Sequence, residues 1–108
     1  MVTAINSVGD WSVQVHEGRG ALAGLRVLDF TQSLASPYGT QILADRGAEV
    51  LKVEVVGIGD ATRGAAPYHP SDTDQRHAGY FHSVNRNKRS IALNLKDPAS
   101  HDIVFDLI

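Results

Sequence analysis

A strand–helix–strand pattern in the first half of the chain limits the possible folds more strongly than any other feature of the sequence. Residues 25–30 form a compact run of strand-forming side chains, and residues 49–55 alternate between polar and apolar with a period near two. Between the two strands, Ser36 predicts a helix N-cap, Pro37 the first helical position and Gly47 the left-handed end of the helix. Such a unit favours two parallel strands joined by a right-handed crossover. We therefore expect an α/β fold.

The second half of the chain returns to regular structure after a long interruption. Residues 56–78 are rich in Gly, Pro, Asp, Ser and Thr, which predicts a surface loop. Residues 80–84 mark a short buried segment, and residues 90–95 alternate as a third strand. Asp97 and Pro98 predict the N-cap and first residue of another helix. The apolar side of that helix consists of Ile103, Val104, Leu107 and Ile108. No glycine or polar segment closes this side, so we expect the chain to be cut within the helix.

The length of 108 residues limits the chain to one domain with one modest core. Residues 1–20 lack a regular pattern and are interpreted as a leader of uncertain order, in which Trp11, Val13 and Val15 alternate as a short strand would. The domain itself is expected at residues 21–108.

Composition argues against several classes of protein and site. A net charge of −2 and a pI near 6.2 argue against a nucleic-acid binder, which usually carries an excess of Lys and Arg. The absence of cysteine excludes disulfides, thiolate zinc sites and cysteine nucleophiles. It is also compatible with the cytoplasm. No stretch approaches the roughly 18 apolar residues of a membrane span, so we expect a soluble cytoplasmic protein.

Three segments are candidates for binding an anionic ligand. Residues 31–35 follow the first strand at the carboxyl edge of the predicted sheet, where free N–H groups at a helix start favour an anion; a purely structural turn is the alternative. Residues 57–60 contain two glycines that would let backbone approach a ligand, or form an ordinary turn. The basic run at residues 85–90 would flank a phosphate or form a solvated loop.

No pattern in the sequence identifies a catalytic or metal-binding group. The carboxylates are not paired at a telling spacing with a base or nucleophile, so solvated or capping roles are expected for them. These residues are Asp29, Asp45, Glu49, Glu54 and Asp60. The histidines at positions 16, 69, 77, 82 and 101 lack a recognised zinc spacing. We expect no metal site.

Several segments keep a common order and spacing. They are residues 22–30, 35–38, 43–50, 52–54, 59–60, 63–64, 85–90 and 93–98. Together they resemble the opening of class III CoA transferases, the CaiB/BaiF and formyl-CoA transferase-like family, over about residues 21–108. The same opening is found, less closely, in α-methylacyl-CoA racemases. The resemblance implies that residues 21–108 are the incomplete N-terminal part of a Rossmann-like CoA-binding domain. It also implies a second, smaller domain and an interlocked homodimer.

The resemblance also implies which residues contact coenzyme A. The positions that line CoA in the family correspond to Leu34, Ala35, Leu93, Asn94, Leu95 and Lys96. Among them, Lys96 would face a CoA phosphate. Formyl-CoA transferases carry a glutamine at Leu34 and a CoA-contacting arginine at Val55, so this chain departs from them at both positions. The lost cation would be replaced by Lys88 or Arg89.

The resemblance further implies that the family's catalytic aspartate corresponds to no residue of this chain and lies beyond residue 108. In the family, this aspartate attacks an acyl-CoA thioester and forms a covalent intermediate, the aspartyl-CoA anhydride. The segment is therefore expected to supply one wall of the CoA site and to be inactive alone. The implied partners are an acyl-CoA and a carboxylic acid, without a metal. Two alternatives stay open: a racemase-like isomerase, and a non-enzymatic CoA- or nucleotide-binding module.

Overall fold

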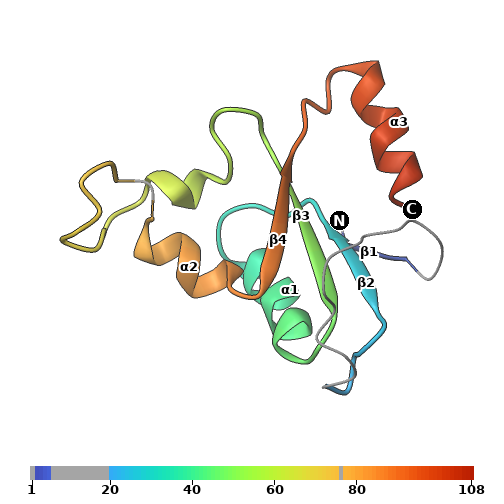
Figure 1. The fold of residues 1–108 in the computed structure, drawn as a ribbon, viewed down its shortest axis with the longest axis horizontal. Helices are drawn as coiled ribbons and strands as arrows, with labels where there is room; N and C mark the ends of the chain where they lie inside the picture. Colours follow the sequence, from blue (N-terminus) through green and yellow to red (C-terminus); the bar gives the residue numbers. More distant parts are fainter. Residues whose placement is uncertain (1, 6–19, 76) are drawn as a thin grey trace.

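The computed structural model describes residues 2–5, 20–75 and 77–108, which form an α/β fold (Figure 1). A four-stranded sheet has the order β1-β2-β3-β4, with β1 at Val2–Ile5, β2 at Arg26–Asp29, β3 at Glu49–Glu54 and β4 at Lys88–Ala92. The last three strands are parallel, as expected, whereas β1 runs antiparallel to β2 and was not predicted. The strand suggested by Trp11, Val13 and Val15 lies outside the described residues.

Helix α1, at Ala35–Asp45, connects β2 to β3 and confirms the strand–helix–strand prediction. Its C-terminus ends as predicted: Gly47 has φ 99°, and the N–H groups of Gly47 and Ala48 donate to Ala44 and Leu43 at 3.0 and 3.1 Å. The predicted N-cap is wrong. The first helical hydrogen bond comes from Tyr38 N to the carbonyl of Leu34, so Leu34 is the N-cap and Ser36 lies inside the first turn.

The remaining helices lie within or after the long connection that follows β3. They are the 3₁₀ helix η1 at Ala61–Gly64, α2 at Gly79–Asn85 and α3 at Pro98–Asp106. The start of α3 is confirmed, because Asp97 caps it by accepting a hydrogen bond from Ala99 N at 3.0 Å. The third strand starts at Lys88, two residues before the predicted range. No helix of the described segments is long and apolar enough to cross a membrane.

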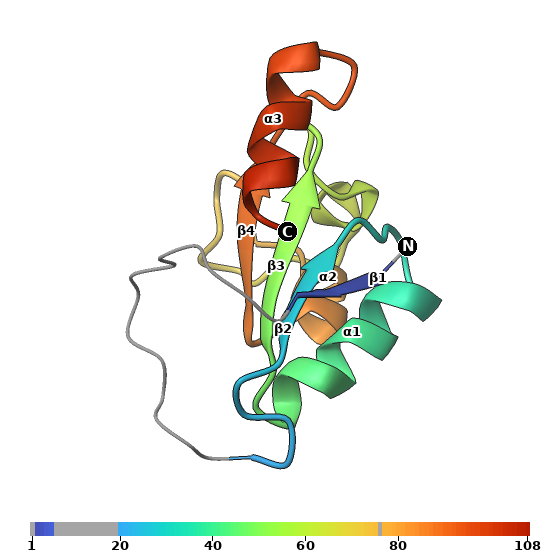
Figure 2. The same ribbon diagram turned by 90° about the vertical axis from the view of Figure 1, so that its right-hand side faces the viewer.

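The parallel strands carry one apolar cluster on each face of the sheet. On the α1 face, Val27 and Val50 pack with Ala44 and Ala48. On the other face, a cluster of Leu28, Leu51, Val53 and Leu93 packs against α3. Figure 2 shows α1 and α3 on opposite sides of the sheet. The core therefore has two layers, each built from alternate strand residues.

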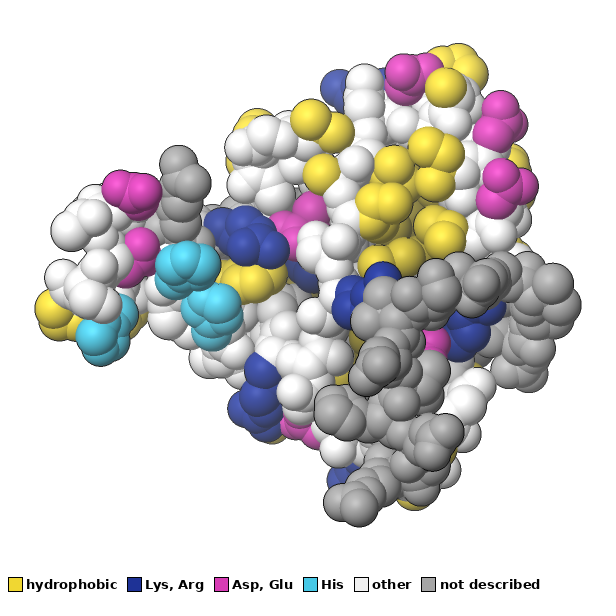
Figure 3. Space-filling model, in the orientation of Figure 1, with side chains coloured by type: hydrophobic (Ala, Val, Ile, Leu, Met, Phe, Trp, Pro, Cys, Tyr) yellow, Lys and Arg dark blue, Asp and Glu magenta, His cyan; other side chains and the backbone are white. Residues whose placement is uncertain are grey.

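Helix α3 covers its face of the sheet only in part. Val104 and Leu107 pack against the cluster, as the apolar pattern predicted, but Ile103 and Ile108 are exposed. The predicted apolar side is therefore only partly covered by the sheet. Phe105 is exposed as well, and Figure 3 shows apolar side chains at the surface between β4 and α3.

Candidate functional site

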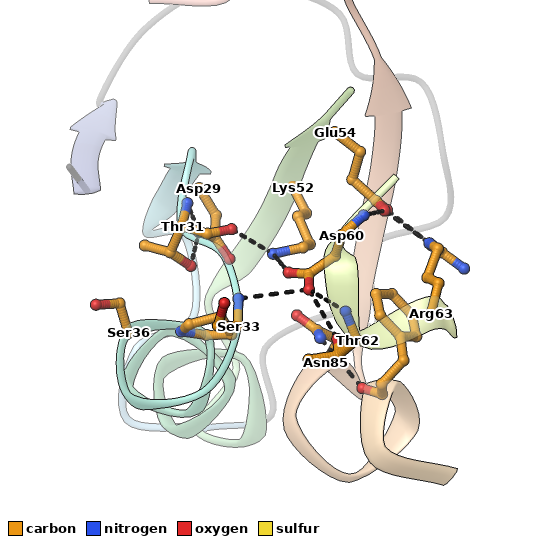
Figure 4. A network of polar contacts seen from close by, with 12 residues as sticks. Asp29, Thr31, Ser33, Ser36, Lys52, Glu54, Asp60, Thr62, Arg63 and Asn85 are labelled. Carbon is orange, nitrogen blue, oxygen red and sulfur yellow. Dashed lines mark hydrogen bonds and ion pairs between the residues drawn. The ribbon is translucent and has the colours of Figure 1, made fainter. Parts of the chain in front are cut away.

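The α1 face of the sheet changes from apolar to charged towards the carboxyl ends of the strands. Along β3, the side chains on this face are Val50, Lys52 and Glu54, and all three are buried. The neighbouring strand β2 has Val27 followed by Asp29 on the same face. Figure 4 shows these charged side chains meeting the turns that follow β2 and β3. We call this group the polar cluster; its charged members are Asp29, Lys52, Glu54, Asp60, Arg63 and Lys88.

Lys52 lies at the centre of the polar cluster with a side chain only 1% exposed. Its Nζ lies 2.9 Å from Asp60 Oδ2 and donates to the carbonyl of Thr31 at 2.6 Å (Figure 4). An ammonium group needs such partners when it is buried, because burial without them costs roughly several kcal/mol of folding free energy per charge. Lys52 thereby joins the segment after β2 to the segment after β3.

Asp60 links the polar cluster to the start of η1. Its Oδ1 accepts hydrogen bonds from Thr62 N at 2.9 Å and Thr62 Oγ1 at 2.7 Å, so it caps the 3₁₀ helix. A longer contact of 3.4 Å comes from Ser33 N. Burial raises the pKa of Asp60, but the hydrogen bonds of Thr62 and the charge of Lys52 outweigh it and lower the pKa. Asp60 is therefore ionised at neutral pH.

Glu54 connects β3 to both β4 and η1. Its carboxylate pairs in bidentate fashion with Arg63, at 2.6 Å to Nε and 2.7 Å to Nη2. Ser90 Oγ and Asp60 N also donate to it. Burial raises the pKa of Glu54, yet the bonds from Arg63, Ser90 and Asp60 prevail and lower it to about 2. The Arg63 guanidinium stacks on Phe81 of α2, 3.7 Å from the ring centre.

Asp29 and Lys88 form the third ion pair of the polar cluster, with Nζ and Oδ2 3.1 Å apart. Thr31 and Thr40 also donate to the Asp29 carboxylate, and these bonds outweigh the effect of burial and lower its pKa. Lys88 donates to Pro37 O and Asn85 Oδ1, each at 2.8 Å. Burial lowers the pKa of Lys88, and Asp29 opposes that shift. The pair ties β4 to β2 and α1.

The polar cluster balances its own charges: three carboxylates face three cations. The expectation of solvated or capping carboxylates is wrong for Asp29 and Glu54, which are buried among donors, and it misses the burial of Asp60. It holds for Asp45, whose ion pair with Arg86 at 2.6 Å lies at the surface. None of the three buried carboxylates has the raised pKa of a general acid.

Of the two glycines in residues 57–60, only Gly59 lies against the polar cluster. Gly59 has φ 72°, and a Cβ there would lie 2.6 Å from Arg63 Cδ and 2.7 Å from Glu54 Oε2. Gly57 has a similar φ of 80°, but nothing lies within 4 Å of its Cβ position. Gly59 is thus required where the turn crosses the Glu54–Arg63 pair, whereas Gly57 serves the turn alone.

Alanine at Gly59 is expected to lower the free energy of unfolding by about 1–3 kcal/mol more than alanine at Gly57, because only Gly59 adds a clash to the unfavourable backbone. Urea denaturation of both variants measures the difference. Gly57→Ala is the matched control, since it shares the left-handed φ. Equal losses in the two variants would show that the Glu54–Arg63 pair adjusts without cost.

The residues expected to line CoA lie in two segments at the carboxyl edge of the sheet. Leu34 and Ala35 begin α1 after β2, and residues 93–96 follow β4, with β3 between the two strands. Leu34 is 50% exposed, and Ala35, Asn94, Leu95 and Lys96 are also exposed. Leu93 is buried in the apolar cluster beneath α3. Its side chain is therefore a core element, and its N–H donates to Glu54 O at 2.9 Å.

The segment after β4 is fixed by local hydrogen bonds. Asp97 N donates to Asn94 O at 2.8 Å and Lys96 N to Asn94 Oδ1 at 3.2 Å, while His101 Nε2 lies 2.8 Å from Leu95 O. These bonds leave the Lys96 side chain exposed. Lys96 is thus held on a defined turn at the edge of the sheet.

The basic run at residues 85–90 is not a solvated loop. Lys88 belongs to the polar cluster and donates to Asn85, while Arg86 forms an ion pair with Asp45. The suggestion that Lys88 replaces a missing CoA-contacting cation is therefore wrong, because its Nζ already binds three oxygens. Arg89 is exposed and stays a prediction. Across residues 20–75 and 77–108, no three His, Asp or Glu side chains gather as metal ligands would.

Comparison with known proteins agrees with the family resemblance. The family model described as CoA-transferase family III matches residues 22–108. A succinyl-CoA:mesaconate CoA-transferase of Haloarcula marismortui is 48% identical over 89 residues, covering 82% of this chain and 22% of the relative. A succinyl-CoA:glutarate CoA-transferase of Mus musculus is 50% identical over 86 residues, covering 80% and 19%. A formyl-CoA:oxalate CoA-transferase of Bradyrhizobium diazoefficiens is 44% identical over 88 residues, covering 82% and 20%.

Solved structures give the same result for the fold. A CaiB/BaiF family protein from Brucella suis superposes with a TM-score of 0.71 at 38% identity, over 81% of this chain and 23% of the other. The protein Rv3272 from Mycobacterium tuberculosis gives a TM-score of 0.72 at 39% identity, over 82% and 24%. The chain thus spans about a fifth of the length of the relatives it matches. With its parallel sheet, its matched motifs and its similarity to proteins of one kind, this chain belongs to CoA-transferase family III.

Proposed function

We propose that the complete protein carrying this chain transfers coenzyme A from an acyl-CoA to a carboxylic acid. The match of residues 22–108 to CoA-transferase family III carries the proposal. The relatives named above are CoA-transferases that differ in the acid they are named for: mesaconate, glutarate and oxalate.

In this proposal, the chain supplies the CoA side of the site. Helix α1 has no side-chain N-cap among the described residues, so the N–H groups of its first turn, at Ala35 and Ser36, have no side-chain partner. They suit an anionic part of the ligand. The exposed Lys96 adds a cation at the same edge of the sheet. Both features favour a phosphate-bearing ligand.

The nucleophile belongs to a part of the protein outside these residues. Asp29, Glu54 and Asp60 are ionised, but every one of them is bonded to a buried or half-buried cation. We propose that an aspartate elsewhere attacks the thioester carbonyl, and that a mixed anhydride forms as the CoA thiolate leaves. The segment alone is then inactive. From the family resemblance we propose that the complete protein is an interlocked homodimer in the cytoplasm that uses no metal.

The activity test incubates the complete protein with succinyl-CoA and, separately, mesaconate, glutarate or oxalate, and follows the acyl-CoA species by mass spectrometry. A new acyl-CoA that forms only when an acid is present supports a transferase. Exchange of the α-proton of a 2-methylacyl-CoA with deuterium, without an acid, would instead indicate the isomerase. CoA binding without either reaction would indicate a binding module.

Alanine at Lys96 is expected to weaken CoA binding by about 1–3 kcal/mol, because a charged hydrogen bond to a phosphate is lost. Isothermal titration calorimetry of the complete protein with CoA measures the change. Arg46→Ala is the control, since Arg46 is also an exposed cation but lies at the opposite end of α1. If both variants bind CoA as the wild type does, Lys96 is not a phosphate contact.

A further inference from the structure

The segment between β2 and α1 is held by the polar cluster at three points. Asp29 accepts from Thr31 N at 2.8 Å, Lys52 donates to Thr31 O at 2.6 Å, and Ser33 N points to Asp60 Oδ1 at 3.4 Å. Figure 4 shows Thr31 and Ser33 facing the cluster from one side while η1 faces it from the other. Two of the three points depend directly on the Lys52–Asp60 pair.

Ser33 has a backbone conformation that needs such support. Its φ is 71°, in the left-handed region, which a residue other than glycine adopts at a cost of about 1 kcal/mol or more. Nothing in residues 31–35 is a glycine that would relax this cost. A non-glycine residue keeps this conformation only where the surrounding structure fixes it.

This backbone conformation determines where α1 begins. Ser33 is followed directly by the N-cap Leu34 and by Ala35, whose side chains point to solvent and not into the core. The direction of the first N–H groups of α1 therefore depends on the turn at Ser33. Since the Lys52 side chain is 1% exposed, the contacts that set this turn lie beneath the surface on which a ligand would rest.

We propose that Lys52 and Asp60 are positioning residues for the ligand: their ion pair holds residues 31–34 so that the first turn of α1 presents its N–H groups to CoA. The proposal rests on the proposed function for its ligand. In this proposal the pair does more than stabilise the fold, because it also fixes the strained turn at Ser33 that precedes α1. Neither residue touches the ligand in this arrangement.

The test compares Lys52→Met and Asp60→Asn in the complete protein. CoA affinity is measured by calorimetry at a temperature where every variant is folded by circular dichroism. Both substitutions are expected to weaken CoA binding at least tenfold. The matched control is Val50→Ala, which creates a cavity on the same face of the same strand without touching residues 31–34. It should lower the melting temperature but keep the affinity within twofold.

Affinity of Lys52→Met equal to that of the wild type would overturn the proposal. Should Lys52→Met not fold, Asp60→Asn decides, because it keeps the size of the side chain while it removes the charge and turns one acceptor oxygen into a donor. Amide exchange by NMR tests the positioning without a ligand: the N–H group of Ser33 should exchange at least tenfold faster in Asp60→Asn, with the centre of α1 unchanged. Unchanged exchange would also overturn it. A wild-type protein that does not bind CoA would refute the proposed function instead.

Discussion

Replacing Asp29 by alanine is expected to lower the free energy of unfolding by about 3–5 kcal/mol, because it leaves Lys88 buried without its counter-ion. The loss should be smaller in the double variant Asp29→Ala with Lys88→Met, in which no charge is left unpaired. Urea denaturation at neutral pH measures both.

The surface pair of Asp45 with Arg86 provides the control for this prediction. Its two atoms lie 2.6 Å apart, closer than those of Asp29 and Lys88, yet both side chains are accessible to water. Asp45→Ala should therefore have a far smaller effect than Asp29→Ala. Equal effects would mean that distance and not burial decides the contribution of these pairs.

The second large effect is expected on acidification. The pKa of Glu54 is lowered from 4.5 to about 2 by the bonds of Arg63, Ser90 and Asp60 N, against the opposing effect of burial. A carboxylate with a lowered folded pKa contributes stability that is complete above its unfolded pKa and is lost as the pH falls through the folded value. About 3 kcal/mol should therefore disappear between about pH 4.5 and about pH 2 through Glu54 alone.

The variant Glu54→Gln isolates this contribution. It should be less stable than the wild type at pH 7, and the difference should shrink as the pH approaches 2, since the wild-type carboxylate is then about half protonated in the folded protein. Denaturation curves at several pH values give the difference directly. A gap of constant size across this range would show that the Arg63 pair does not depend on the ionisation of Glu54.

The elements that sequence reasoning found correctly are those with local signals. Gly47 ends α1 through its own φ, and Asp97 caps α3 through a bond two residues along the chain. The start of α1 was missed because the preceding turn at Ser33 depends on Asp60, 27 residues away. A Ser-Pro pair is a good local signal, but the distant contact decided which residue caps the helix.

The polar cluster was missed for a similar reason. Residues 49–55 alternate between polar and apolar side chains, which suggests a strand with one solvent-exposed face, yet Lys52 and Glu54 are buried. Parallel strands are commonly covered on both faces, so charged residues at alternate positions of such a strand were a signal of buried pairs. Their partners, Thr31, Asp60 and Ser90, come from three other segments. The family motifs located the CoA edge but not the support beneath it.

The long sequence separation within the polar cluster bears on how the chain folds. Asp29 and Lys88 are 59 residues apart, and neither can be paired until β4 has joined the sheet. A partly folded chain containing only β2, α1 and β3 would hold Asp29 without that ammonium, so such intermediates are disfavoured and folding becomes more nearly all-or-none. We expect contacts between such distant segments to form late in folding. Their loss should accelerate unfolding far more than it slows folding, so we expect the polar cluster mainly to lower the unfolding rate of the native state.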